Sequence, residues 1–137
     1  MKRTALKRKT PMRSGSKRSA YRRRERDYEH MAIVRRLPCS VRTLIGGTRF
    51  AELLGNDALC AGEVQADHMG RRTMGMKAKD DSCAPMCRKH HDHRTNFLGY
   101  FRSYNKAAMR EFTEWAIGAA REHVAEVRAI HQRAQEG

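Results

Sequence analysis

The sequence predicts an α+β fold: a small metal-stabilised core of two strands and a helix, flanked by an N-terminal helix and a long C-terminal helix. Three observations lead to this fold class. Apolar residues recur at three- and four-residue steps near the C-terminus. Two short segments with strand character, 62–68 and 82–86, surround a glycine-containing loop. Histidine, cysteine and aspartate, the side chains that bind transition metals, crowd into residues 65–96.

The basic charge of the chain is concentrated at its N-terminus. The formal net charge is +14, and 14 of the 29 lysine and arginine residues lie in residues 1–36 beside three acidic residues. Such a charge attracts polyanions by counterion release and favours sequence-independent binding to a phosphate backbone. The alternative is a solvated basic tail that serves solubility. Residues 1–18 lack apolar periodicity and are expected to form a disordered arm that orders on nucleic acid.

Length and composition suit one small domain. Residues 19–137 are expected to form it, with the metal core at about 37–100. Only 39 % of the residues are hydrophobic, which favours a structural metal as a supplement to the core. Because no continuous apolar segment follows the basic N-terminus, we expect a soluble, cytoplasmic protein that does not contact membranes. Four cysteines in a chain without an export signal then indicate metal binding rather than disulfides.

The first predicted element is a helix over 19–36. Ser19 is its candidate N-cap, apolar residues follow at roughly helical spacing, and Leu37-Pro38 ends it. Its polar face is rich in arginine and suits a duplex backbone or simply solvent. After this helix, Gly46-Gly47 breaks the chain and Thr48 is placed to cap a short helix over 49–54.

A strand, a loop and a returning strand are predicted next. Residues 62–68 alternate weakly and carry His68 near their end, 69–81 form the loop, and 82–86 return. Pro85 restricts the second strand to a short or edge position. A helix is expected to begin near Cys87.

The C-terminal helix is predicted over about 105–135. Its apolar stripe repeats at helical spacing and is widened by Trp115 and Ile117, with the following members: Met109, Phe112, Ala116, Ala119, Ala120, Val124, Val127 and Ile130. Ordinary core packing explains this stripe, and no cofactor is expected there.

Cysteine spacing indicates a structural zinc site. Cys87 and His90 form a C-x-x-H pair at the start of a helix, a spacing at which both side chains reach one tetrahedral ion. Cys39 and Cys60 complete a set of three cysteines and one histidine. Cys83 is the competitor, because it stands four residues before Cys87, but a lone strand cysteine is more often a small buried apolar residue.

A second set of residues suits phosphodiester hydrolysis, which needs a base to deprotonate water and a cation to neutralise developing charge. His68 has the intrinsic pKa of such a base. Asp67, His91 and His93 are candidate ligands of one divalent ion, Mg2+ or Mn2+. Side chains of neighbouring strand residues point to opposite faces, so a turn or bulge at 67–68 is expected. A surface or capping role is the alternative for any single histidine.

The segments ADHMG (66–70), KAKDD (77–81) and PMCRKHH (85–91) resemble the HNH (His-Me finger) endonucleases. The resemblance is greatest to small phage and prophage proteins related to recombination-enhancing nucleases. It implies a ββα-metal fold, His68 as general base, His91 as ligand of the catalytic metal, a structural zinc at the cysteine site, and a recombinase filament as a partner by analogy. It covers about residues 1–100, with 65–93 the specific part.

The sequence departs from the family pattern at three places. Cys39 and Cys60 are separated by an insertion rather than by two residues. The family often has an asparagine before the helix, where this chain offers Asp80, Asp81 or Ser82. A second helix histidine usually follows four residues after the first, but position 95 is threonine.

The expected function is a metal-dependent endonuclease that hydrolyses DNA phosphodiester bonds, is phage-encoded with the host cytoplasm as its location, and has low sequence specificity. A zinc-stabilised nucleic-acid-binding protein without catalysis is the alternative, and RNA stays open as a substrate. Basic residues around the core are candidates for phosphate contacts: Arg71, Arg72, Arg88, Lys89 and Arg94.

Overall fold

A computed structural model describes residues 26–70 and 79–137 of the chain. The fold is α+β, with a small two-stranded sheet and a long C-terminal helix, as the sequence predicts. The predicted disordered arm, 1–18, lies outside the described residues, and the single domain over 19–137 stays a prediction. Among the helices of the described ranges, none is long and apolar enough to cross a bilayer.

The sheet pairs β1 (Val64–His68) with β2 (Cys83–Cys87) in antiparallel fashion. Both strands match the predicted segments closely. The register is continuous and pairs Asp67 with Ala84 and His68 with Cys83. The expected bulge at 67–68 is therefore wrong. Pro85 is buried in β2, and its carbonyl accepts a hydrogen bond from the Ser40 hydroxyl.

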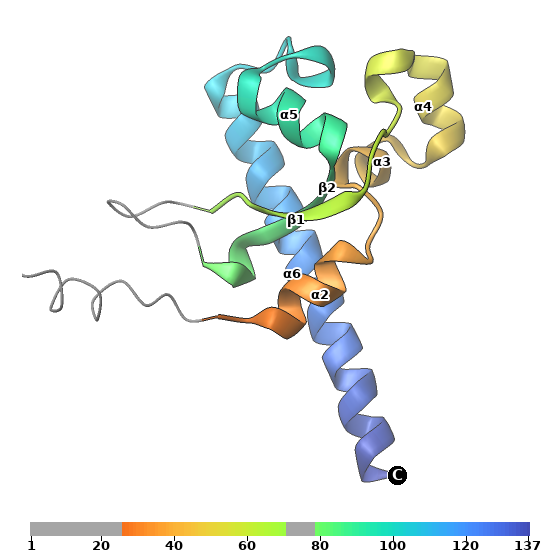
Figure 1. The fold of residues 1–137 in the computed structure, drawn as a ribbon, viewed down its shortest axis with the longest axis vertical. Coiled ribbons are helices and arrows are strands. Elements are labelled where there is room, and N and C mark those ends of the chain that lie inside the picture. The colour runs from red at the N-terminus through yellow and green to blue at the C-terminus, as the bar shows by residue number, and fades with distance from the viewer. Residues whose placement is uncertain (1–25, 71–78) are drawn as a thin grey trace, which may run out of the picture.

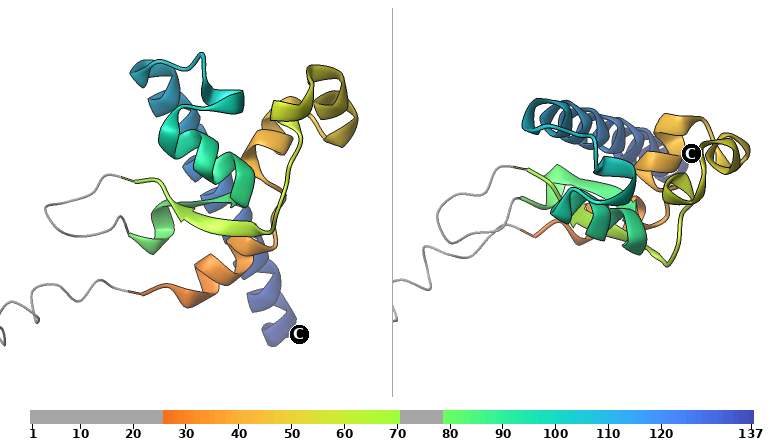
Figure 2. Two further views of the ribbon diagram at one scale, coloured as in Figure 1. Left: turned by 45° about the horizontal axis from the view of Figure 1, so that its top comes forward. Right: turned by 90° about the horizontal axis from the view of Figure 1, so that it is seen from above.

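Helices cover both faces of this hairpin. Figure 2 shows α6 (Lys106–Glu136) along one face and α5 (Arg88–Asn96) on the other. Helix α5 follows β2 directly, with Cys87 as its N-cap. Asn105 caps α6 by accepting a hydrogen bond from the Ala108 amide. The last turns of α6 project beyond the rest of the fold (Figure 1), which is why Ile130 of the predicted stripe is exposed.

The N-terminal helix differs from the prediction. Helix α2 spans Tyr28–Arg35, and Asp27 caps it by accepting a hydrogen bond from the His30 amide at 3.0 Å. Residues 26 and 27 are not helical, so one continuous helix over 19–36 is wrong there; 19–25 lie outside the described residues. The Asp27 side chain accepts a hydrogen bond from an amide of the first turn, which makes the helix begin at Tyr28.

The insertion between Cys39 and Cys60 is helical. It contains α3 (Ser40–Ile45), α4 (Thr48–Leu54) and a 3-10 turn at Asn56–Ala58. Only the second of these helices was predicted. Gly46 closes α3 with a left-handed φ of 95°, a conformation that glycine adopts without a Cβ penalty.

The core consists of two packed clusters. In the first, α6 packs on β2 and on the 3-10 turn Gly99–Phe101, with Phe101 and Met86 fully buried. In the second, Met31 and Val34 of α2 pack against Val124 of α6. The buried members of the predicted α6 stripe pack against the hairpin and α2, namely Met109, Phe112, Ala116, Ile117, Ala120 and Val124. Trp115 and Ala119, which the prediction placed in or beside this stripe, are exposed.

Candidate functional site

Three cysteines and one histidine converge where β2 meets α5. Cys39 precedes α3, Cys60 follows the Asn56–Ala58 turn, Cys87 ends β2, and His90 lies in the first turn of α5. Their ligand atoms all lie within 4.8 Å of one another. These four residues, the set that the sequence indicates, are close enough to bind a metal ion such as zinc.

Two of the three distances from His90 to the sulfur atoms fall in the range of tetrahedral zinc coordination, and the third is slightly shorter. Nδ1 of His90 lies 3.1 Å from Sγ of Cys87, 3.6 Å from Sγ of Cys39 and 3.8 Å from Sγ of Cys60. Ligands bound to zinc at about 2.0–2.3 Å with tetrahedral angles lie roughly 3.3–3.8 Å apart. His90, Cys39 and Cys87 are buried, whereas Cys60 is exposed. The donor set has the composition of closed structural zinc sites.

Contacts around the cluster orient its members. Nε2 of His90 lies 2.8 Å from the carbonyl oxygen of Asp57, which fixes the proton on Nε2 and leaves the lone pair of Nδ1 for a metal. The Lys89 ammonium donates to the carbonyls of Asn56 and Leu59, and the Lys89 amide donates to that of Ala61. These bonds hold the segment that carries Cys60 against α5.

The pKa values of the three cysteines in the cluster shift in different directions. A hydrogen bond from the Cys39 thiol, together with one from the His90 backbone amide, lowers the pKa of Cys87 to about 3. The same bond and burial raise the pKa of Cys39, while burial and the nearby Cys87 charge raise that of Cys60. The metal-free cluster therefore favours one thiolate and two protonated thiols. A dication that binds here replaces the two remaining protons.

His68 lies at the end of β1 beside a buried carboxylate. Its Nε2 atom is 2.8 Å from Oδ1 of Asp80, which belongs to the 3-10 turn Asp80–Ser82. Asp80 is 1 % exposed, whereas the side chain of His68 is 21 % exposed. If Nε2 donates to Asp80, then Nδ1 carries the lone pair that a general base needs.

Hydrogen bonds connect Asp80 to the start of α2 and to α6. Its Oδ2 accepts a hydrogen bond from the Asp27 amide at 2.9 Å. The Asp27 carboxylate binds Arg128 of α6 through both oxygens, at 2.8 and 2.9 Å. These bonds connect α6 through the cap of α2 to the carboxylate behind His68. The pKa of Asp27 is lowered, chiefly by the hydrogen bond from the His30 backbone amide and next by the hydrogen bonds from Arg128.

Asp67 precedes His68 and meets α5 instead. Its Oδ1 is 3.4 Å from Nε2 of His91. Its Oδ2 accepts a hydrogen bond from Nε of Arg94 at 3.0 Å and lies 2.9 Å from Nη2 of the same guanidinium in an ion pair. Two ligands of one ion at about 2.1 Å lie roughly 3.0–3.4 Å apart. Oδ1 of Asp67 and Nε2 of His91 therefore fit adjacent positions around a divalent ion.

His93 does not join this pair. It lies two residues after His91 on α5, hence on a different face of the helix. It packs so closely against Gly99 that a Cβ at position 99 would fall 2.2 Å from Nδ1 of His93. The structure thus brings Asp67 and His91 together and directs His93 away from them. Within the described residues, the cysteine cluster is the one group of three or more such side chains with metal-binding proximity.

No protein-family model, curated protein or solved structure matches the chain. The geometry of the two sites alone therefore supports a functional assignment. The four residues of the cysteine cluster lie close enough to bind a metal ion such as zinc. At the end of β1, His68 is hydrogen-bonded to Asp80, and Asp67 is paired with His91.

Two residues have roles that sequence reasoning missed. Asp80 was one of three candidates near the start of β2, and only the fold shows that its carboxylate is the one behind His68. Arg94 was expected to contact phosphate, but its guanidinium binds Asp67. Lys89 binds backbone carbonyls, and Arg71 and Arg72 lie outside the described residues. The signal for Arg94 was its three-residue spacing from His91, which places both on one helix face.

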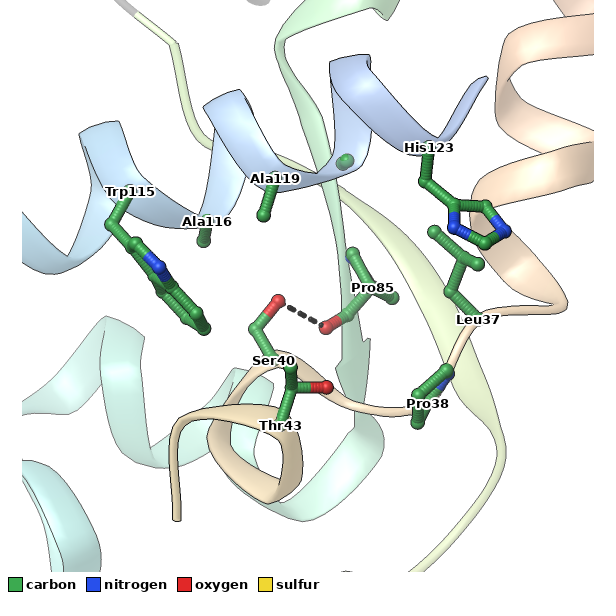
Figure 3. A pocket seen from close by; sticks show the side chains of 10 residues that line it. Leu37, Pro38, Ser40, Thr43, Pro85, Trp115, Ala116, Ala119 and His123 are labelled. Carbon is green, nitrogen blue, oxygen red and sulfur yellow. Dashed lines mark hydrogen bonds between the residues drawn. The ribbon is translucent and has the colours of Figure 1, made fainter. Parts of the chain in front are cut away.

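A separate apolar pocket of about 210 Å³ lies between α6 and the segment before α3 (Figure 3). Trp115 and His123 stand at its two ends along α6, and Leu37 and Pro38 lie at the His123 end. The hydrogen bond from Ser40 to the Pro85 carbonyl crosses its floor. This pocket contains neither His68 nor Asp67, so it is distinct from the candidate site.

Proposed function

We propose that the chain is a metal-dependent endonuclease of the HNH (His-Me finger) type that hydrolyses DNA phosphodiester bonds with low sequence specificity and is phage-encoded. One observation carries the proposal: His68, held by the buried carboxylate of Asp80, directly follows the residue whose carboxylate faces His91. Because β1 has a continuous register, His68 and Asp67 leave opposite faces of the strand at its last two residues, so a phosphodiester that reaches both must lie across the end of β1.

The architecture supports the proposal. A hairpin continues directly into a helix, and the helix start carries two of the four cysteine-cluster ligands. This is the arrangement that a ββα-metal core requires, with zinc holding the hairpin, the helix and the 39–60 insertion together. The net charge of +14 supplies the attraction to a polyanionic substrate.

In the proposed reaction His68 is the general base. Nδ1 of His68 takes a proton from water as the water oxygen attacks phosphorus. The bond between phosphorus and the leaving oxygen breaks, and the leaving oxygen takes a proton from solvent. Asp80 stabilises the imidazolium that forms, because its carboxylate stays hydrogen-bonded to Nε2.

Asp67 and His91 would hold the divalent ion. Their oxygen and nitrogen donors suit Mg2+ or Mn2+ with further positions filled by water and phosphate. When bound, the ion neutralises charge that develops on the phosphate. Nδ1 of His91 faces the Asp92 carboxylate at 3.6 Å, which favours the tautomer with the lone pair on Nε2, toward Asp67.

A nucleic-acid-binding protein without catalysis is the second candidate. The observation that favours it is the ion pair between Arg94 and Asp67, which gives Asp67 a structural role of its own. Under this alternative, a zinc-stabilised fold and the basic charge of the chain are sufficient for nucleic-acid binding. His68 would then be dispensable for binding.

The deciding experiment is nicking of a supercoiled plasmid by the zinc-loaded chain, with and without Mg2+ or Mn2+. Wild type is compared with His68→Ala and with His131→Ala, which removes an exposed histidine of α6. Zinc content and circular dichroism verify that each variant is folded. We expect metal-dependent nicking by wild type and His131→Ala, and a loss of about 100-fold or more in His68→Ala. DNA binding without cleavage by all three proteins would support the binding protein instead.

A parallel assay on structured RNA tests whether the chain prefers DNA or RNA.

A further inference from the structure

Arg94 occupies one oxygen of the candidate metal ligand Asp67. Its Nε donates a hydrogen bond to Oδ2 and its Nη2 forms an ion pair with the same oxygen, while Oδ1 faces His91. The contact is shielded from solvent, because the Asp67 side chain is 6 % exposed and that of Arg94 is 17 % exposed. Arg94 and His91 lie one turn apart on α5, so a single helix face presents a guanidinium and an imidazole to the same carboxylate.

This arrangement leaves the ligand pair without net negative charge. The guanidinium stays protonated at any physiological pH and neutralises Asp67. A hard divalent ion binds in proportion to the negative charge of its ligands and the rigidity of its site. With one neutralised carboxylate and one imidazole, Asp67 and His91 attract such an ion weakly, and the nearby guanidinium repels it.

We propose that Arg94 is an internal counter-ion that keeps divalent-ion binding at Asp67 and His91 weak until a phosphodiester of the nucleic acid reaches the site. The phosphate brings the missing negative charge and oxygen ligands. It also offers the guanidinium a planar, charged acceptor of the kind that arginine binds well. Metal and nucleic acid then bind cooperatively. This inference builds on the proposed function, since it concerns the same metal site.

Thermodynamic linkage makes the proposal quantitative. If nucleic acid raises the affinity for the ion by some factor, the ion raises the affinity for nucleic acid by the same factor. Removing the Arg94 charge should strengthen ion binding in the absence of nucleic acid and reduce that factor. Both quantities are equilibrium constants, so they are measured without cleavage.

The test measures binding of Mn2+ to the zinc-loaded full chain by electron paramagnetic resonance of the free ion. It is done with and without a short phosphorothioate-substituted DNA duplex that gel analysis shows to stay intact. Arg94→Gln removes the charge and keeps a hydrogen-bonding side chain, Arg94→Lys keeps the charge, and Arg102→Met removes an exposed arginine elsewhere. Zinc content reports the integrity of each variant.

We expect wild type, Arg94→Lys and Arg102→Met to bind Mn2+ weakly alone and at least about tenfold more tightly with the duplex. Arg94→Gln should bind Mn2+ at least about tenfold more tightly than wild type without DNA, and the duplex should add less. Equal Mn2+ affinity of Arg94→Gln and wild type would overturn the counter-ion role while leaving the nuclease proposal intact. Absence of Mn2+ binding in every form, with DNA present, would overturn both the counter-ion role and the proposed metal site.

Discussion

The Nε2 atom of His68 lies 2.8 Å from Oδ1 of Asp80, a carboxylate that is 1 % exposed. A buried carboxylate at this distance determines which ring nitrogen carries the proton, and it stabilises the ring once it is charged. His68 is the last residue of β1 and Asp80 lies in the 3-10 turn that precedes β2, so the pairing of the two strands brings them together.

Asp80→Asn should lower the rate of metal-dependent nicking by about 100-fold, because an amide neither fixes the same tautomer nor stabilises an imidazolium. Asp81→Asn is the matched control, since Asp81 is adjacent but exposed. Nicking rates at saturating DNA, with zinc content verified, measure the effect. Equal nicking rates for Asp80→Asn and Asp81→Asn would show that Asp80 does not support His68 in the reaction.

Cys39→Ser and Cys60→Ser should each lose bound zinc, while Cys83→Ala should retain it. The first two remove ligand atoms of the cluster, whereas Cys83 is buried with Met31 and Val34 in the second core cluster. Structural zinc contributes about 10–16 kcal/mol in small zinc domains, so loss of a ligand should also unfold the core. Metal analysis and circular dichroism test this, and zinc loss in Cys83→Ala would mean that the ligand set is wrong.

Asp27→Asn should lower the unfolding free energy at pH 7 by about 0.5–1 kcal/mol, the range of a partly exposed ion pair. Asparagine preserves the helix cap but not the charge pair with Arg128. The pKa of Asp27 is lowered in the folded state, so its stabilisation is complete above the unfolded pKa of about 3.9 and is lost as pH falls through the folded value.

The difference between wild type and Asp27→Asn in urea denaturation should therefore shrink below about pH 4. Glu122→Gln, which removes an exposed charge on α6, controls for a general change in net charge. A difference that stays constant from pH 7 to pH 3 would contradict the assignment to the Asp27 carboxylate.

Phe101→Ala should lower the unfolding free energy by about 3–5 kcal/mol, as removal of a buried aromatic ring does. Phe101 is fully buried, with ring centroids 4.9 Å from Tyr104 and 5.0 Å from Phe112. Phe50→Ala is the control, because Phe50 is 55 % exposed. Urea denaturation of the zinc-loaded proteins measures both, and similar small losses would show that the aromatic cluster is not part of the stable core.

Local pattern predicted most of the regular structure. The repeat from Met109 to Val124 has a period that only a helix satisfies, and β1 and β2 begin and end within two residues of the predicted strands. The N-terminal helix was extended too far because Asp27, a strong capping residue, stands inside an otherwise helical pattern. Helix α3 was missed because six residues carry too little periodicity.

By itself, the sequence determined the α+β class, the long C-terminal helix and the four residues of the cysteine cluster, since residue type, period and spacing are local properties. Only the tertiary structure decided that Asp80 backs His68, that Arg94 neutralises Asp67, and that His93 turns toward Gly99. These contacts depend on the strand register and on which face of α5 meets the sheet. Neither is a property of any short segment, because both result from the simultaneous packing of α2, α5 and α6 on one hairpin.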